Sequence, residues 1–400
     1  MTHPASHFEQ TPTLDANPVA AGSTKPEVTL GRLIIMGLII SAFLLAVNAF
    51  VCATASSFFD LPGWPRWQVI PGVFPIAFIL TTILGFRLTN PLLRAVYSLS
   101  AAWLGFLNFA FFAAIACWIV DLPDWLAGWP LPRFALAAVL YGLAVLVTIY
   151  GLINAASLRV TRVTIPLPNL PEAWIGHTIA LVTDLHLGHI SGPKFLHRVL
   201  SRLRLLQPDA VLISGDMFDG TPLGLDHLAA PWRDYSAPRG VYFVTGNHDE
   251  FADRSIYINA VQRTGVRVLN NEKISLHGLQ IVGVHDSEVG DPALLRKILR
   301  EVKLDPTQPS ILVVHRPENL SVSEAEGISL QLSGHTHGGQ LWPWSLLVSR
   351  IYGRFAHGLQ RLNKLQVFTS YGVGTWGPPL RVATRSEIIL IRLEKATNQD

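Results

Sequence analysis

The sequence has 400 residues, half of them hydrophobic, and its 31 basic and 28 acidic side chains leave a formal net charge of only +3. This length allows two or three domains, and a weak charge without a dense basic run disfavours a dedicated nucleic-acid partner. The chain has only two cysteines, Cys52 and Cys117, which excludes a disulfide framework.

Four apolar stretches lie within the first 158 residues, at 30–51, 69–85, 99–120 and 134–155. A membrane-spanning helix needs about 20 apolar residues, and these stretches lack the polar stripe of a buried helical domain. We therefore predict a transmembrane anchor with about four helices over residues 29–156, preceded by a flexible tail over residues 1–28. A cleaved signal peptide fits the first stretch poorly, because its apolar run is long and further apolar segments follow.

The short segments that flank these stretches predict an orientation. Basic residues gather on one side of the bilayer: Lys25, Arg87, Arg94, Arg159 and Arg162. The connections on the other side carry aspartates and the tryptophans Trp64, Trp67, Trp125 and Trp129. Basic flanks favour the cytoplasm. We expect a multi-pass protein of the plasma (inner) membrane, with its C-terminal half on the cytoplasmic side.

After Arg162 the pattern changes to short β-branched runs that alternate with helical segments. Strands are predicted at 177–182, 210–214, 241–245, 279–284, 311–314, 329–332, 365–369 and 387–393, and helices at 193–206, 254–264 and 291–302. This alternation is typical of an α/β domain, which we place over residues 157–400.

Polar residues that can bind metal follow five of the predicted strands. The motifs are Asp184-Leu185-His186, Gly215-Asp216, Gly246-Asn247-His248-Asp249, His315 and Gly334-His335-Thr336-His337. All of them lie at the C-terminal ends of strands, the edge at which open α/β sheets build their sites. Each motif alone is weak, because a lone histidine is more often packed and a Gly-Asp pair is most often a turn. Their joint occurrence indicates a metal site.

Together these motifs resemble the calcineurin-like metallophosphoesterase superfamily. The 334–340 run, with 372–375, Arg381 and Glu387, is similar to its bacterial YkuE/YaeI-like membrane-associated subgroup. The resemblance implies two packed β-sheets flanked by helices, and a centre of two divalent metal ions. One ion would be held by Asp184, His186 and His337, the other by Asn247, His315 and His335, with Asp216 bridging. Mixed nitrogen and oxygen ligands suit Mn²⁺, Fe or Zn²⁺ better than Ca²⁺ or Mg²⁺.

The implied reaction is the hydrolysis of phosphomonoesters or phosphodiesters by a hydroxide that the two metals activate. Of these two classes of substrate, we expect phosphodiesters. His248 follows a candidate ligand without being one, so it is placed to protonate the leaving group. Asp249 either orients His248 or stabilises the turn, and both interpretations stay open. Arg316 and His189 are weaker candidates for contact with the substrate, since both also fit the pattern of surface loops.

The membrane tether favours a lipid-linked phosphoester as the substrate. Two interpretations of the apolar run at 341–348 stay open. It contacts the bilayer or a lipid chain, or it packs inside the domain. Two alternatives from other functional classes are an inactive membrane receptor or scaffold that binds a phospho-ligand, and a transporter regulated by the domain. The complete set of candidate ligands argues against the first. The scarcity of polar residues within the apolar stretches argues against the second.

Overall fold

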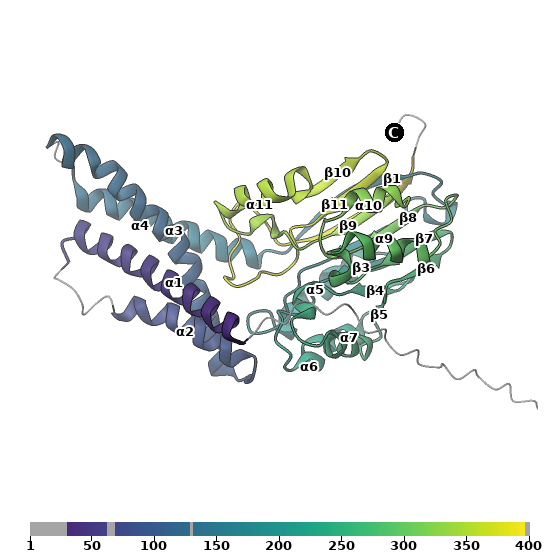
Figure 1. Ribbon diagram of the computed structural model, residues 1–400, viewed down its shortest axis with the longest axis horizontal. Helices are drawn as coiled ribbons and strands as arrows, with labels where there is room; N and C mark the ends of the chain where they lie inside the picture. The colour runs from purple at the N-terminus through teal and green to yellow at the C-terminus, as the bar shows by residue number, and fades with distance from the viewer. Residues whose placement is uncertain (1–29, 62–68, 129–130, 397–400) are drawn as a thin grey trace, which may run out of the picture.

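The computed structural model describes residues 30–61, 69–128 and 131–396. The tail predicted over residues 1–28 lies outside the described residues, as do Trp64, Trp67, Trp129 and the side chain of Trp125. Four helices project from one side of a larger α/β domain (Figure 1). The chain therefore has the two-part organisation that the sequence predicts.

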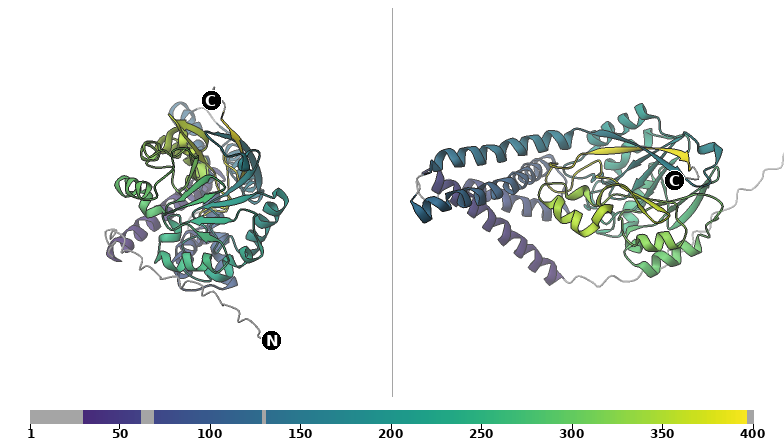
Figure 2. Two further views of the ribbon diagram at one scale, coloured as in Figure 1. Left: turned by 90° about the vertical axis from the view of Figure 1, so that its right-hand side faces the viewer. Right: turned by 90° about the horizontal axis from the view of Figure 1, so that it is seen from above.

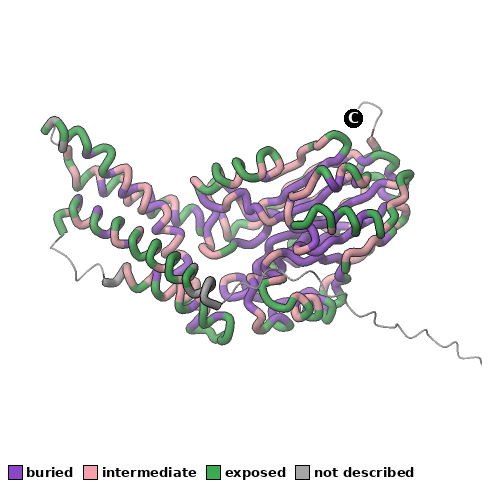
Figure 3. The backbone as a smooth tube through the Cα atoms, viewed as in Figure 1, coloured by how far each residue is buried: buried purple, intermediate pink, exposed green. Residues whose placement is uncertain are grey.

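The projecting helices are α1 (Leu30–Phe58), α2 (Val69–Gly85), α3 (Pro91–Ala127) and α4 (Arg133–Ala156). They run alternately away from the domain and back to it, so the α2–α3 connection lies beside the domain and the α3–α4 connection at the far end (Figures 1 and 2). Their outer surfaces are largely exposed (Figure 3), and the exposed residues include the apolar Leu38, Ile119 and Leu146, each more than 60% exposed. Such a surface is suited to lipid.

The expected number of four spans is corrected to three in the described part of the chain. The segments Gly37–Phe58, Pro91–Pro123 and Arg133–Ala156 are long and apolar enough to cross a membrane. Helix α2 has only 17 residues, a rise of about 25 Å against a hydrocarbon core of about 30 Å. It still packs within the bundle, since Phe78 stacks on Tyr97 of α3.

Two six-stranded sheets form the centre of the C-terminal domain. The first has the order β1 (Arg159–Leu167), β12 (Glu387–Lys395), β2 (Thr178–Val182), β3 (Ala210–Ser214), β4 (Val241–Val244), β5 (Arg267–Val268). The second has the order β10 (Gly358–Leu362), β11 (Leu365–Thr369), β9 (Leu330–Ser333), β8 (Ser310–Val313), β7 (Leu279–Gly283), β6 (Glu272–Leu276). Strands β2 to β5 are parallel in the first sheet, as are β7, β8, β9 and β11 in the second. Their C-terminal ends therefore share one edge in each sheet.

The sheets pack face to face over an apolar core in which Leu181 and Leu212 meet Ile281 and Leu330. Helices α5 (Pro193–Leu206), α6 (Leu225–Ala229) and α7 (Arg254–Gln262) cover the outer face of the first sheet, and α9 (Pro292–Glu301) and α10 (Leu320–Ala325) that of the second. Strands buried on both faces have continuous apolar sequences. The predicted pair of packed sheets flanked by helices is confirmed.

Helix α4 is tied to the domain through a buried asparagine. The Asn154 side-chain amide donates hydrogen bonds to the carbonyl oxygens of Arg381 at 2.9 Å and Thr384 at 2.8 Å. The Arg381 amide in turn donates to the Gly151 carbonyl at 3.0 Å. The end of the membrane helix and the loop at 380–384 thus form one hydrogen-bonded unit.

We expect Asn154→Ala to lower the thermal unfolding midpoint of the purified full chain by several degrees. Two buried carbonyls would lose their partner, at a cost of about 1–3 kcal/mol each. Scanning fluorimetry in detergent measures the shift. Ser157→Ala is the matched control, because this exposed hydroxyl donates a hydrogen bond to the Ile153 carbonyl in the preceding turn of the same helix. Equal midpoints for the two variants would refute the coupling.

Candidate metal centre

The candidate ligands gather where the parallel strands of both sheets end. Asp184 and His186 follow β2, Asp216 follows β3, Asn247 follows β4, His315 follows β8, and His335 and His337 follow β9. The C-terminal edges of the packed sheets meet here, so side chains up to 153 positions apart face one another. Seven residues predicted from the sequence as ligands therefore lie in one place.

The backbone at this edge is unusual. Five of the seven candidates have a left-handed φ, between 46° and 69°: Asp184, His186, Asp216, His335 and His337. Residues with a Cβ rarely adopt this conformation, and it persists only where the surroundings enforce it. A Cβ at Gly215 would lie 2.6 Å from His315 Nδ1 and 2.7 Å from the Gly246 backbone. Glycine at this position is therefore what allows the close approach of β3, β4 and β8.

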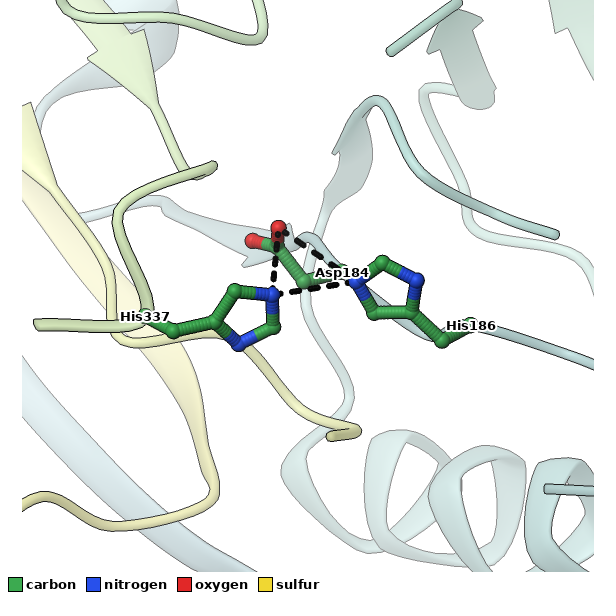
Figure 4. Close-up of side chains that lie close together, drawn as sticks. All are labelled: Asp184, His186 and His337. Carbon is green, nitrogen blue, oxygen red and sulfur yellow. Dashed lines mark hydrogen bonds and ion pairs between the residues drawn. The ribbon is translucent and has the colours of Figure 1, made fainter. Parts of the chain in front are cut away.

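Asp184, His186 and His337 form a first group of facing donor atoms (Figure 4). The Nε2 atoms of the two histidines are 3.0 Å apart, and Asp184 Oδ1 lies 3.4 Å from His337 Nε2 and 3.9 Å from His186 Nε2. All three side chains are buried. Two imidazole nitrogens and a carboxylate oxygen at this spacing can bind one cation.

Asn247, His315 and His335 form a second group beside Asp216, and Asp216, Asn247 and His335 line the same cavity. His315 Nε2 lies 3.2 Å from Asp216 Oδ2 and 3.3 Å from His335 Nδ1. Asp216 Oδ2 is also 3.7 Å from His186 Nε2, so this carboxylate lies between the two groups. Asn247 Oδ1 is buried with no hydrogen-bond partner in the described part of the chain. An orphaned carbonyl oxygen beside imidazoles fits a bound cation.

Burial sets the protonation of the histidines. It lowers the pKa of His186 and of His335 to about 3, and that of His337 well below its ordinary value. These imidazoles are therefore neutral at physiological pH, which is the form that ligates metals. Burial also disfavours the charged form of His315, but the adjacent Asp216 carboxylate outweighs it and raises the pKa of His315 to about 10. His315 is the one imidazole of these four that must lose a proton when metal binds.

Hydrogen bonds orient the histidines that flank Asp216. His315 Nδ1 donates to the Ser214 carbonyl at 2.8 Å, which directs Nε2 toward Asp216. His248 Nδ1 lies 3.0 Å from the Asp219 carbonyl, and the backbone amide of His248 donates to Asp216 Oδ1. A ring nitrogen of His248 also lies within 4.8 Å of donor atoms of His186 and Asp216. The carbonyl of Asp219, which sequence reasoning missed, thus orients the predicted acid.

The carboxylate of Asp249 binds backbone amides and not the His248 side chain, as far as the described hydrogen bonds show. It accepts hydrogen bonds from the amides of Gly246 at 2.9 Å, Phe218 at 2.9 Å and Met217 at 3.2 Å. These bonds join the turn after β4 to the turn after β3. Of the two interpretations of Asp249, they support the turn-stabilising one.

Arg381 is a second residue whose role the sequence did not reveal. Its guanidinium is completely buried. Nη2 lies 3.1 Å from His337 Nδ1 and donates to the carbonyls of Gly374 at 2.6 Å and Tyr371 at 2.7 Å. Arg381 therefore holds the loop that contains Tyr371 and Gly374 against the candidate ligand His337. Only its position after that loop could have signalled this.

Arg316 and His189 are engaged by residues other than the candidate ligands. The Arg316 guanidinium pairs with the buried Asp286 carboxylate, with Nε at 2.6 Å from Oδ1. The His189 ring packs against Tyr97 of α3, 5.4 Å between ring centroids. Neither side chain lines the cavity at the metal centre, as far as the described residues define it. Contact of these two residues with the substrate stays a prediction.

A sequence model of the Calcineurin-like phosphoesterase family matches residues 177–339, a range that contains all seven candidate ligands. Residues 177–339 are a calcineurin-like phosphoesterase domain. The predicted family is thereby confirmed, and with it a phosphoester hydrolase domain whose His and Asp cluster can bind divalent metal.

Relatives of the phosphoesterase domain occur in bacteria and animals. The chain is 33% identical to an uncharacterized metallophosphoesterase of Campylobacter jejuni, over 62% of this chain and 66% of that protein. It is 34% identical to a transmembrane protein with metallophosphoesterase domain of Danio rerio, over 62% of this chain and 60% of that protein. It is 27% identical to the uncharacterized metallophosphoesterase YkuE of Bacillus subtilis, over 60% of this chain and 87% of that protein. The chain thus spans about two thirds or less of the first two.

Proposed function

We propose that this protein hydrolyses phosphomonoesters or phosphodiesters with two divalent metal ions, next to a membrane surface, and that its substrate is lipid-linked. The observation that carries the proposal is the position of the Asp216 carboxylate between two groups of buried donor atoms. One group comprises Asp184, His186 and His337, and the other Asn247, His315 and His335. Mn²⁺, Fe and Zn²⁺ suit this donor set.

When bound, two adjacent cations lower the pKa of a shared water and neutralise the oxygens of the phosphate. Residues of this chain position the substrate and supply the proton for the leaving group. Asp216 presents the same carboxylate oxygen, Oδ2, to His186 of the first group and His315 of the second, while its Oδ1 accepts a hydrogen bond from the His248 amide. His248 keeps Nε2 available because Nδ1 is engaged by the Asp219 carbonyl, so it can protonate the departing alkoxide. The rings of Phe251 and Trp376 pack against the His248 ring, with centroids 4.4 Å and 5.7 Å from its own.

We further propose that the domain lies on the cytoplasmic side of the plasma (inner) membrane. Arg87 and Arg94 belong to the end of the bundle next to the domain, and Arg159 begins the domain directly after α4. Asp60 and Asp121 belong to the far end of the bundle (Figure 1). Basic flanks favour the cytoplasmic face.

The test is the release of p-nitrophenolate from bis(p-nitrophenyl) phosphate and from p-nitrophenyl phosphate by the purified full chain in detergent. We expect chelation to abolish turnover and Mn²⁺, Fe²⁺ or Zn²⁺ to restore it. The ratio of kcat/KM for the two esters measures the preference for diesters over monoesters. Metal-loaded, folded protein without turnover would instead favour the inactive receptor or scaffold.

A further inference from the structure

A cavity of about 700 Å³ joins the metal centre to the membrane helices. Asp216 and His335 line its inner end, and Val47 of α1 together with Leu107 and Phe111 of α3 lines its outer end. This volume lies within the range of about 300–1,000 Å³ of pockets that enclose small ligands. The site is thus continuous with an apolar space inside the anchor.

One wall of this cavity is helix α11 (Trp344–Tyr352). Trp344 and Val348 face the cavity. Leu346, Leu347 and Ile351 are 64%, 52% and 64% exposed on the outer surface of the same helix. Exposed apolar side chains gathered in this way mark a contact with a partner or a membrane, and α11 adjoins a membrane helix. The outer surface of α11 is therefore suited to lie in the bilayer.

Helix α11 is attached to α3 through Asn108, a polar residue in a spanning segment. Asn108 Oδ1 accepts a hydrogen bond from Trp344 Nε1 at 2.9 Å, and its amide donates to the Trp342 carbonyl at 3.1 Å. The Trp342 ring also packs edge-on against Phe112 of α3, 5.6 Å between centroids. Polar residues inside spans are costly and generally functional. Here the asparagine fixes the cavity wall to the anchor.

Positions along α3 give the depth of the cavity in the membrane. Asp121, which pairs with Arg133 at 2.6 Å, marks the far end of the bundle. Phe111 lies ten residues before Asp121 in α3, about 15 Å at about 1.5 Å per residue. This is half of a hydrocarbon core about 30 Å thick. The outer end of the cavity therefore lies near the middle of the bilayer, and the lining residues Leu104 and Leu107 lie at the level of the leaflet nearer to the domain.

We infer that the cavity holds the hydrocarbon chain of a lipid phosphoester, which enters sideways from the near leaflet between α1, α3 and α11. This inference rests on the proposed hydrolysis and specifies its substrate class. The apolar lining at membrane depth suits a hydrocarbon chain, while the inner end presents the candidate ligands to the phosphate. A water-soluble phosphoester would leave most of this lining uncovered.

A matched pair of diesters tests the inference: ethyl p-nitrophenyl phosphate in solution and hexadecyl p-nitrophenyl phosphate in phosphatidylcholine vesicles that carry the full chain. We expect wild type to favour the hexadecyl ester in kcat/KM by at least about tenfold, because the bilayer concentrates this ester beside the cavity and the bound chain holds its phosphate at the metal centre. Leu44→Trp fills the cavity and should lower this preference about tenfold or more. Leu45→Trp, on the exposed side of α1 and away from the cavity that the described residues define, should preserve it.

A kcat/KM ratio of hexadecyl to ethyl ester near one in wild type would overturn the binding of the hydrocarbon chain in the cavity. An equal ratio in Leu44→Trp and Leu45→Trp would also overturn it. Hydrolysis of neither ester would instead overturn the proposed function. In that case, photolabelling with hexadecyl phosphate that carries a terminal diazirine tests the chain site alone. The inference is supported if residues 104–112 are labelled in wild type and in Leu45→Trp but not in Leu44→Trp. Equal labelling of the two variants refutes it.

Discussion

Asp216→Asn is expected to lower kcat for bis(p-nitrophenyl) phosphate by about 10³-fold or more. The Asp216 carboxylate lies between the two donor groups, 3.2 Å from His315 Nε2 and 3.7 Å from His186 Nε2. Asparagine keeps the shape but removes the negative charge shared by two cations. The expected loss corresponds to about 4 kcal/mol of transition-state stabilisation. Steady-state kinetics and the metal content by plasma mass spectrometry measure both effects.

Asp226→Asn is the matched control for this substitution. Asp226 pairs with Arg263 at 2.7 Å, and both side chains are more than half exposed. Its replacement should change neither kcat nor the bound metal, because exposed ion pairs contribute little. An Asp216→Asn protein that keeps its metal and turns over within tenfold of wild type would contradict the bridging role.

His248→Gln is expected to affect substrates according to their leaving group. An alkoxide needs a proton as it departs, so hydrolysis of dimethyl phosphate should slow by about 10²–10⁴-fold. p-Nitrophenolate departs without a proton, so bis(p-nitrophenyl) phosphate should slow by less than about tenfold. The substitution leaves the turn in place, because the bond to Asp216 comes from the backbone amide of His248 and not from its side chain.

The measurement is kcat for both diesters with wild type, His248→Gln and the control His197→Gln. His197 is an exposed residue of α5, and its replacement should leave both rates unchanged. If His248→Gln slows both diesters by the same factor, His248 positions the substrate and does not act as the acid.

Buried strands and an amphipathic helix could be predicted closely from the sequence. The predicted strands 210–214 and 365–369 coincide with β3 and β11, and the predicted helix 193–206 coincides with α5. Short, largely apolar runs bounded by turn residues define such strands. Strand β1 was missed, because its polar and basic residues alternate at a sheet edge and only its pairing with β12 makes it a strand.

The ligand set could be predicted for a related reason: each candidate directly follows a parallel strand, and such strands end at a common edge. The contacts that orient these residues could not be predicted from the sequence. Arg381 meets His337 across 44 positions, and Asn108 meets Trp342 across 234. The cavity depends on how α1 and α3 dock on the domain, which no local pattern encodes. Helix α2 was taken as a span on composition, and its 17-residue length decides against it.

The most direct test of the proposed centre is a titration of the chelated full chain with Mn²⁺, followed by electron paramagnetic resonance and by turnover of bis(p-nitrophenyl) phosphate. Because Asp216 lies between the two donor groups, we predict that turnover rises with the second equivalent of metal. It also predicts that the spectrum then shows two spin-coupled ions. Full turnover with one equivalent and an uncoupled signal would contradict a dinuclear centre.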